Sequence, residues 1–129
     1  MLIETEASSE ALILLNAWHE RAPTLASANA LAWHLLTASS LEQRNPERAL
    51  SLLQSFPTPD QTDPFETAMV KDTLAQALFQ TGRIDEAIPL QEEAFQTCLK
   101  SPLSWLQPVQ LWEMRQRLQS MRRARGSNR

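Results

Sequence analysis

The chain has little of what strands, disulfides and membrane spans require. Its 129 residues include only 2 glycines and no tyrosine, whereas strand-rich folds use turn glycines and many aromatic or β-branched residues. Cys98 is the single cysteine, so no internal disulfide can form. The longest apolar run, residues 11–15, falls far short of the roughly 18 residues of a membrane span. The composition therefore argues against a β-rich fold, a disulfide scaffold and a transmembrane segment.

The first ten residues carry three acidic side chains and no basic one. A secretory signal begins with a basic stretch, so the sequence does not predict one. A lone thiol fits a reducing compartment. We expect a cytoplasmic protein with one domain over residues 1–129, because this length suits one domain better than two.

Charge is distributed unevenly along the chain. Residues 1–112 carry 6 basic and 14 acidic side chains, whereas residues 113–129 carry 6 basic and 1 acidic. The body is therefore acidic and the C-terminal segment basic.

The chain is rich in Leu, Ala, Gln and Glu, which are good helix formers. Apolar residues recur at helical spacing in five or six segments. The first predicted helix begins near Ser8 or Ser9 and ends at Pro23. The third predicted helix begins at Asn45-Pro46, where Asn45 is the capping residue and Pro46 occupies the first turn. Gly82 stands where a helix stop needs a left-handed residue, and residues 56–64 form a proline-rich linker.

An internal repeat runs through the middle of the chain. Residues 31–36 (LAWHLL) match residues 74–79 (LAQALF) at an offset of 43, and residues 47–53 match residues 85–91 at an offset of 38. A longer turn in the first copy explains the difference. Each copy reads helix, turn, helix, with small residues where two helices must approach closely. These small residues are Ala32, Ala49, Ala75 and Ala87.

The pattern resembles the tetratricopeptide repeat, abbreviated TPR. In the second copy Leu74-Ala75, Leu78, Gly82, Ala87-Ile88 and Ala94-Phe95 stand at the family's spacing. The first copy, with residues 29–33 and 44–50, looks like a variant common in bacterial members. Two positions depart from the family pattern: Lys71 replaces a usual aromatic residue, and Gln91 a usual large apolar one.

The resemblance implies an all-α fold of antiparallel helical hairpins, stacked as a short right-handed solenoid with flanking terminal helices. A half-repeat at the start indicates that the chain is cut from, or evolved from, a longer array. Two repeats are few for a stable stack, so the terminal helices or a partner must supply further contacts. The expected segments are a half-repeat or capping helix at 8–22, repeats at 26–57 and 65–100, a capping helix at 103–124 and a frayed basic tail at 125–129.

In this family the first helix of each hairpin lines a concave groove that holds a peptide or helix. The resemblance therefore implies an adaptor or scaffold that binds a partner protein between the helices expected at 27–40 and 65–81. Trp33 and Phe79 would anchor the partner, and Asn29 and Gln76 would bind its backbone. Alternatively, Trp33, Leu36 and Phe79 pack against the terminal helices. The groove residues are Asn29, Trp33, Leu36, Met69, Asp72, Gln76 and Phe79.

Two other roles stay open. The chain can be a structural subunit of a larger complex or a self-associating domain, held through its tryptophan-bearing terminal helices. It can also be a regulator whose C-terminal arginines contact an anionic partner. Alternatively, those arginines form a solvated helix end, or Arg122 and Arg123 pair with acidic residues of the body. The arginines concerned are Arg115, Arg122, Arg123 and Arg125.

Several classes are disfavoured. The groove positions are mostly neutral or acidic, which disfavours a clamp for a C-terminal carboxylate, and the acidic body disfavours nucleic acid. His19, His34 and Cys98 show no metal-ligand spacing. No phosphate loop, nucleophile elbow or carboxylate pair occurs. We expect no enzyme activity, no cofactor and no metal.

Overall fold

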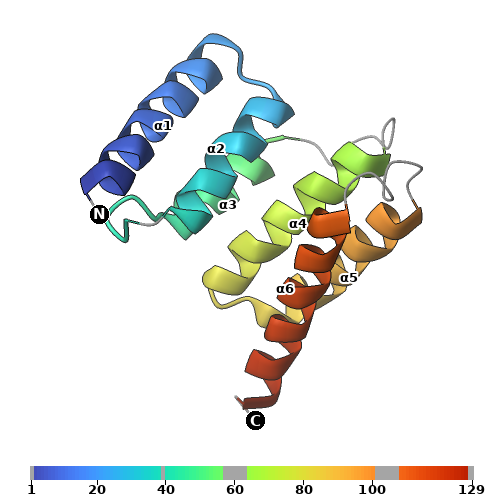
Figure 1. Cartoon of the computed structure of the whole chain (residues 1–129). Coiled ribbons are helices and arrows are strands. Elements are labelled where there is room, and N and C mark those ends of the chain that lie inside the picture. Colours follow the sequence, from blue (N-terminus) through green and yellow to red (C-terminus); the bar gives the residue numbers. More distant parts are fainter. Residues whose placement is uncertain (1, 39, 57–63, 101–107, 128–129) are drawn as a thin grey trace. The chain divides into compact units, whose positions relative to one another are not determined.

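A computed structural model describes residues 2–38, 40–56, 64–100 and 108–127, with only the backbone described for residues 2–8. Every regular element in these ranges is a helix and none is a strand, which confirms the predicted all-α class (Figure 1). The chain divides into two compact units: unit 1, residues 1–57, and unit 2, residues 58–129. The single TPR-like domain stays a prediction. The helices are α1 (Leu2–Arg21), α2 (Leu25–Thr37), α3 (Pro46–Gln54), α4 (Pro64–Gln80), α5 (Ile84–Lys100) and α6 (Pro108–Ser127).

Local capping explains where the helices of unit 1 begin. The Thr24 hydroxyl accepts a hydrogen bond from the amide of Ser27, and the Ser27 hydroxyl accepts one from the amide of Thr24, so α2 starts with a capping box. The Asn45 side chain accepts from the amide of Arg48, and Pro46 has no amide hydrogen that would need a partner. The predicted start of the third helix at Asn45-Pro46 is confirmed.

Small residues form the contacts at the centre of unit 1. Ala28 and Ala32 on α2 and Ala49 on α3 have no exposed surface, so α2 and α3 approach closely. Leucines fill the space around these alanines, as close packing requires. Helix α1 packs on α2 as the third helix of the unit. The buried leucines are Leu31, Leu35, Leu36 and Leu53.

Unit 2 is built on the α4–α5 hairpin, which has the most extensive helix contact in the chain. Gly82 lies between the helices with φ of 89°, a left-handed conformation that suits glycine, so the predicted stop is confirmed. The amide of Arg83 donates to the carbonyl of Leu78 at 2.8 Å and closes the turn. Ala75 and Ala87 have no exposed surface, as the close-packing argument predicted.

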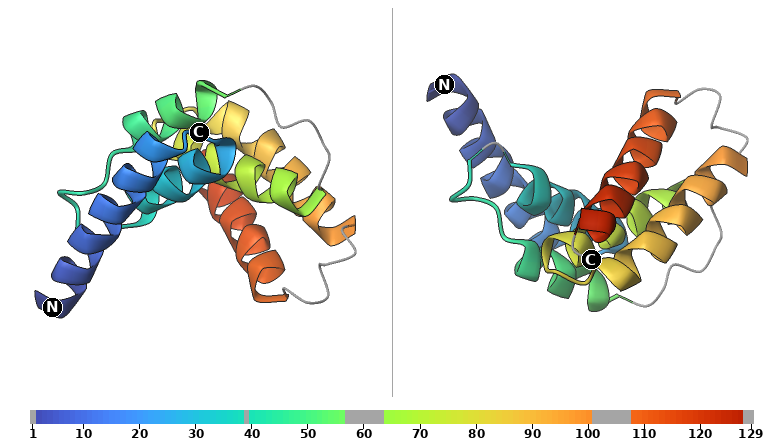
Figure 2. Two further views of the ribbon diagram at one scale, coloured as in Figure 1. Left: turned by 90° about the horizontal axis from the view of Figure 1, so that it is seen from above. Right: turned by 90° about the horizontal axis from the view of Figure 1, so that it is seen from below.

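Helix α6 packs mainly on α5 and crosses the hairpin at an angle (Figure 2). Its inner face carries Met114, Leu118 and Met121, all buried at helical spacing. Met114 meets Ala68 of α4 and Cys98 of α5 in one apolar cluster. Burial in this cluster raises the pKa of the Cys98 thiol, and the nearby Asp72 charge raises it further.

The helix ends differ from the predicted ones at both termini. Helix α1 begins at Leu2, ahead of Ser8 and Ser9, because no helix-breaking residue interrupts residues 2–7. Helix α6 continues through Gly126 to Ser127, where fraying was expected, and an ion pair from Arg125 to Asp85 of α5 holds its last turns. Linker residues 57–63, and the predicted start of the last helix before residue 108, lie outside the described residues.

Candidate protein-binding surfaces

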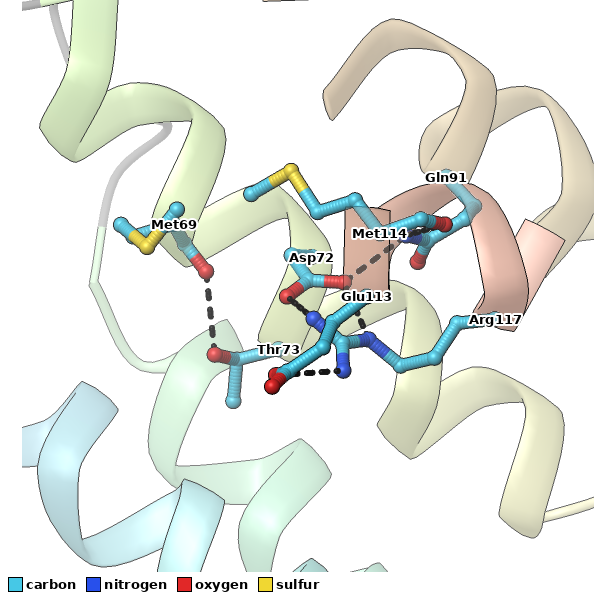
Figure 3. Close-up of polar contacts among 7 residues, drawn as sticks. All are labelled: Met69, Asp72, Thr73, Gln91, Glu113, Met114 and Arg117. Atoms are coloured by element: carbon cyan, nitrogen blue, oxygen red, sulfur yellow. Dashed lines mark hydrogen bonds and ion pairs between the residues drawn. The ribbon is translucent and has the colours of Figure 1, made fainter. Parts of the chain in front are cut away.

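A buried polar cluster joins the three helices of unit 2 (Figure 3). Asp72 of α4 is only 4% exposed. Arg117 of α6 donates to both of its carboxylate oxygens, Nε to Oδ1 at 2.9 Å and Nη2 to Oδ2 at 2.5 Å. Gln91 of α5 donates through Nε2 to Asp72 Oδ1 at 2.8 Å and to the Met114 carbonyl at 3.1 Å. Asp72 was predicted to line a groove, but its carboxylate is already bound within the unit.

The cluster explains why position 91, in the interior of unit 2, holds a polar glutamine. Gln91 has no exposed surface, and its amide nitrogen bridges Asp72 and the α6 backbone. A two-bond arginine–carboxylate pair is strong and directional, so it also sets the position of α6. The signal was present in the sequence, because Arg117 interrupts the apolar series Met114, Leu118 and Met121 on the inner face of α6. Sequence reasoning missed this pairing.

An apolar hollow opens between α5 and α6, with a volume of 260 Å³. Trp112 is 55% exposed beside it, and Leu99 is also exposed. Arg115 supplies the only charged side chain among the lining residues, and no ion pair of Arg115 is found in the described part of the chain. Phe95 and Leu99 were not predicted as site residues. The lining consists of Phe95, Leu99, Pro108, Leu111, Trp112 and Arg115.

The arginines of α6 lie mostly against acidic residues of unit 2. Arg122 Nη2 is 2.7 Å from Glu92 Oε2, and Arg125 Nε is 3.2 Å from Asp85 Oδ1. Arg123 donates instead to the Ser120 hydroxyl at 3.3 Å. The sequence left open that Arg122 and Arg123 pair with acidic residues of the body. The structure contains this pairing for Arg122.

The groove residues expected in the first repeat all lie on α2. Leu36 is buried, whereas Asn29 and Trp33 are half-buried. The Asn29 Oδ1 atom is buried with no hydrogen-bond partner among the described residues. Asn29 and Trp33 thus keep some exposed surface, and Leu36 belongs to the core of unit 1.

The corresponding residues of the second repeat lie on α4. Met69 packs on the cluster of Ala68, Cys98 and Met114, while Gln76 and Phe79 are half-buried. Trp33 and Phe79 therefore belong to different compact units. The groove that would join the two sets stays a prediction.

The two histidines have local hydrogen-bond partners. His19 Nδ1 lies 2.7 Å from the Ser27 hydroxyl, and His34 Nε2 lies 3.1 Å from Gln43 Oε1. Within the described ranges, no three His, Cys, Asp or Glu side chains come together as a metal site would require. The histidine contacts tie α1 to α2 and α2 to the following turn.

Helix α1 has a second exposed apolar surface. Ile13 is 67% exposed, Leu14 is 68% exposed and Trp18 is 46% exposed. The opposite side of the helix faces the rest of unit 1, where Asn16 accepts a 2.7 Å hydrogen bond from Arg48 of α3. Apolar residues this exposed and this close together are typical of interaction sites.

Comparison with known proteins finds no protein-family model, no curated protein and no solved structure that matches the chain. Among the described residues, no helix is both long enough and apolar enough to cross a membrane.

Proposed function

We propose that the chain is a TPR-like interaction module that binds an apolar segment of a partner protein. The observation that carries this proposal is the hollow between α5 and α6, with the half-exposed Trp112 beside it and Arg115 on its wall. Tryptophan and arginine are the residues that most often dominate binding energy at protein interfaces. The proposal assigns no reaction, cofactor or metal to the chain.

The size and chemistry of the hollow favour a peptide side chain over a small molecule. Its 260 Å³ lies below the roughly 300–1,000 Å³ of typical ligand pockets. One or two apolar side chains fill such a space. The charge of Arg115, which has no ion pair among the described residues, suits an acidic residue next to them. The proposed ligand is thus a short segment with an apolar anchor beside an aspartate or glutamate.

Peptide selection against the full chain tests the proposal. Peptides selected from a random library should carry an apolar residue beside an acidic one. Trp112→Ala should weaken the best peptide about 30-fold, since aromatic anchors contribute about 2 kcal/mol or more. Arg115→Ala should weaken it about fivefold, and Gln119→Ala, an exposed change on the same helix, should have no effect. Unchanged affinity in Trp112→Ala would overturn the proposed site.

The groove implied by the TPR resemblance is tested with the same peptides. If the peptides bind to the α2 and α4 helices instead, the double variant Trp33→Ala and Phe79→Ala will bind them more weakly, while Trp112→Ala will bind them with unchanged affinity. Both residues are half-buried, so circular dichroism must first show that helicity is intact. The regulator role has less support, because Arg122 and Arg125 already face Glu92 and Asp85.

A further inference from the structure

Six exposed residues define the outer face of α1. At about 100° per residue they fall within an arc of about 140°, on the side of the helix opposite Asn16 and His19. On that opposite side, Asn16 accepts a hydrogen bond from Arg48 of α3, and His19 contacts the Ser27 hydroxyl of α2. The outer face of α1 consists of Glu10, Ile13, Leu14, Ala17, Trp18 and Arg21, all of them exposed.

The order of these residues is self-complementary. About the midpoint between positions 15 and 16, an acidic residue mirrors a basic one, Glu10 with Arg21. In the same way Ile13 mirrors Trp18, and Leu14 mirrors Ala17. A two-fold axis through that midpoint would bring each residue of one helix opposite its mirror residue on a second, antiparallel helix. Among these six residues, every contact would then be acid with base, or apolar with apolar.

We propose that this face binds α1 of a second copy of the chain, in an antiparallel pair about a two-fold axis. Ile13, Leu14 and Trp18 would be covered at the centre, and Glu10 of each copy would pair with Arg21 of the other at the two ends. No side-chain hydrogen bond or ion pair of Glu10 or Arg21 occurs in the part of the chain that the structure describes. Both charges are therefore available to a second copy.

Charge decides between the two directions in which the helices can pair. In a parallel pair, Glu10 would lie opposite Glu10 and Arg21 opposite Arg21, so both ends would repel. In the antiparallel pair both ends attract. Repulsion between like charges therefore disfavours the parallel pair, so the antiparallel pair is the one expected.

The expected dimer is weak. Three large apolar side chains from each copy make an interface smaller than the roughly 1,200 Å² of stable complexes. We expect a dissociation constant on the order of 10 μM and exchange between monomer and dimer. This surface is separate from the α5–α6 hollow, so the dimer and the proposed peptide site can each fail while the other holds.

Sedimentation of the full chain from roughly 1 to 300 μM brackets such a constant and tests the dimer. The wild type should shift from monomer to dimer across this range. Leu14→Asp should remain monomeric. The control Leu41→Asp, at another highly exposed leucine outside α1, should dimerise like the wild type. A monomer at every concentration, or equal dimerisation in Leu14→Asp, overturns the proposal.

Charge reversal tests the antiparallel register. Glu10→Arg alone and Arg21→Glu alone should each weaken dimerisation about tenfold, because each places like charges at both ends. Mixing the two variants should restore association, since every end of the mixed dimer again joins opposite charges. Restoration should fade in high salt. These surface changes leave the core intact, and failure of the mixture to associate more tightly than either variant rules out this register.

Discussion

Units 1 and 2 each set a third helix against a helical hairpin, but the outer faces of these helices differ. On α6, arginines and polar residues follow Trp112, and Arg122 and Arg125 pair with α5. On α1, the exposed face is apolar between Glu10 and Arg21. The exposed face of α1 is therefore more apolar than the exposed C-terminal half of α6.

The two units also attach the third helix by different means. Asp72, Gln91 and Arg117 join α6 to the hairpin inside unit 2. In unit 1, α1 is linked by the exposed Arg48–Asn16 bond and by the contact of His19 with the buried Ser27 hydroxyl, and neither is a charge pair. A helical hairpin can therefore hold a neighbouring helix through a buried charge pair, or through apolar packing and hydrogen bonds without one.

The largest expected effect comes from breaking the buried pair. Arg117→Ala should lower the free energy of unfolding of unit 2 by about 3–5 kcal/mol, because it leaves the Asp72 carboxylate buried without its counter-charge. Arg123→Ala, an exposed change on the same helix, should cost about 0.5 kcal/mol or less. Denaturant unfolding followed by circular dichroism measures both.

Removing both charges provides the second arm of that experiment. The double variant Asp72→Ala and Arg117→Ala should be less destabilised than Arg117→Ala alone, since no buried charge is left unpaired. A cost below about 1 kcal/mol for Arg117→Ala would erase the contrast between the units, because it would equal the cost of an ordinary surface pair.

A smaller effect is expected at the junction of α1 and α2. The buried Ser27 hydroxyl donates to the Ala22 carbonyl, accepts from the Thr24 amide and lies against His19. Ser27→Ala should therefore lower the free energy of unfolding of unit 1 by about 1–2 kcal/mol. Ser51→Ala, on the exposed side of α3, is the matched control. Equal unfolding midpoints for both variants would show that this junction does not hold α1.

The pH dependence of unit 2 should reveal its buried thiol. The pKa of Cys98 is raised in the folded chain, mainly by burial, so the unfolded thiol loses its proton first as pH rises. Stability is thus complete below the ordinary value of 9.0 and falls above it, by at most about 1.4 kcal/mol per pH unit. Tyrosine is absent and cannot mask this decline. Urea unfolding between pH 8 and pH 10 should show a shallower slope in Cys98→Ala than in the wild type, and equal slopes would contradict the assignment.

The smallest effect concerns the end of α6. Arg125 and Asp85 form an exposed pair, so Arg125→Ala should change the free energy of unfolding by about 0.5 kcal/mol or less. Hydrogen exchange is the sharper measurement, because the last turn of α6 should exchange faster in the variant. A loss above 1 kcal/mol would mean that this pair anchors α6 as firmly as the buried cluster.

Local chemistry made much of the fold predictable. Asn45-Pro46 and Gly82 determine a helix start and a helix stop through hydrogen bonding and backbone freedom, and both lie where expected. The buried alanines at 32, 49, 75 and 87 follow from the repeat, because close helices require small side chains. The start of α1 was less predictable, since the serines at 8 and 9 cap only if the chain before them leaves the helix.

The candidate sites were harder to predict, because they depend on which residues meet in space. Leu36 looked like a groove residue but packs in the core of unit 1, and Asp72 looked open to a partner but binds Arg117, 45 positions away. Phe95 and Trp112 line one hollow although they belong to different helices. Periodicity identifies the face on which a residue lies, and it does not identify the helix that covers that face.

The sequence by itself determined the helices, their caps, the close-packed alanines and the self-complementary order of residues along α1, because each depends on neighbours within a few positions or on the period of the helix. Only the tertiary structure decided that α6 closes over Asp72, that Gln91 bridges three helices and that the outer face of α1 stays exposed. Burial and charge pairing between distant segments depend on how helices pack, and packing is a property of the folded chain.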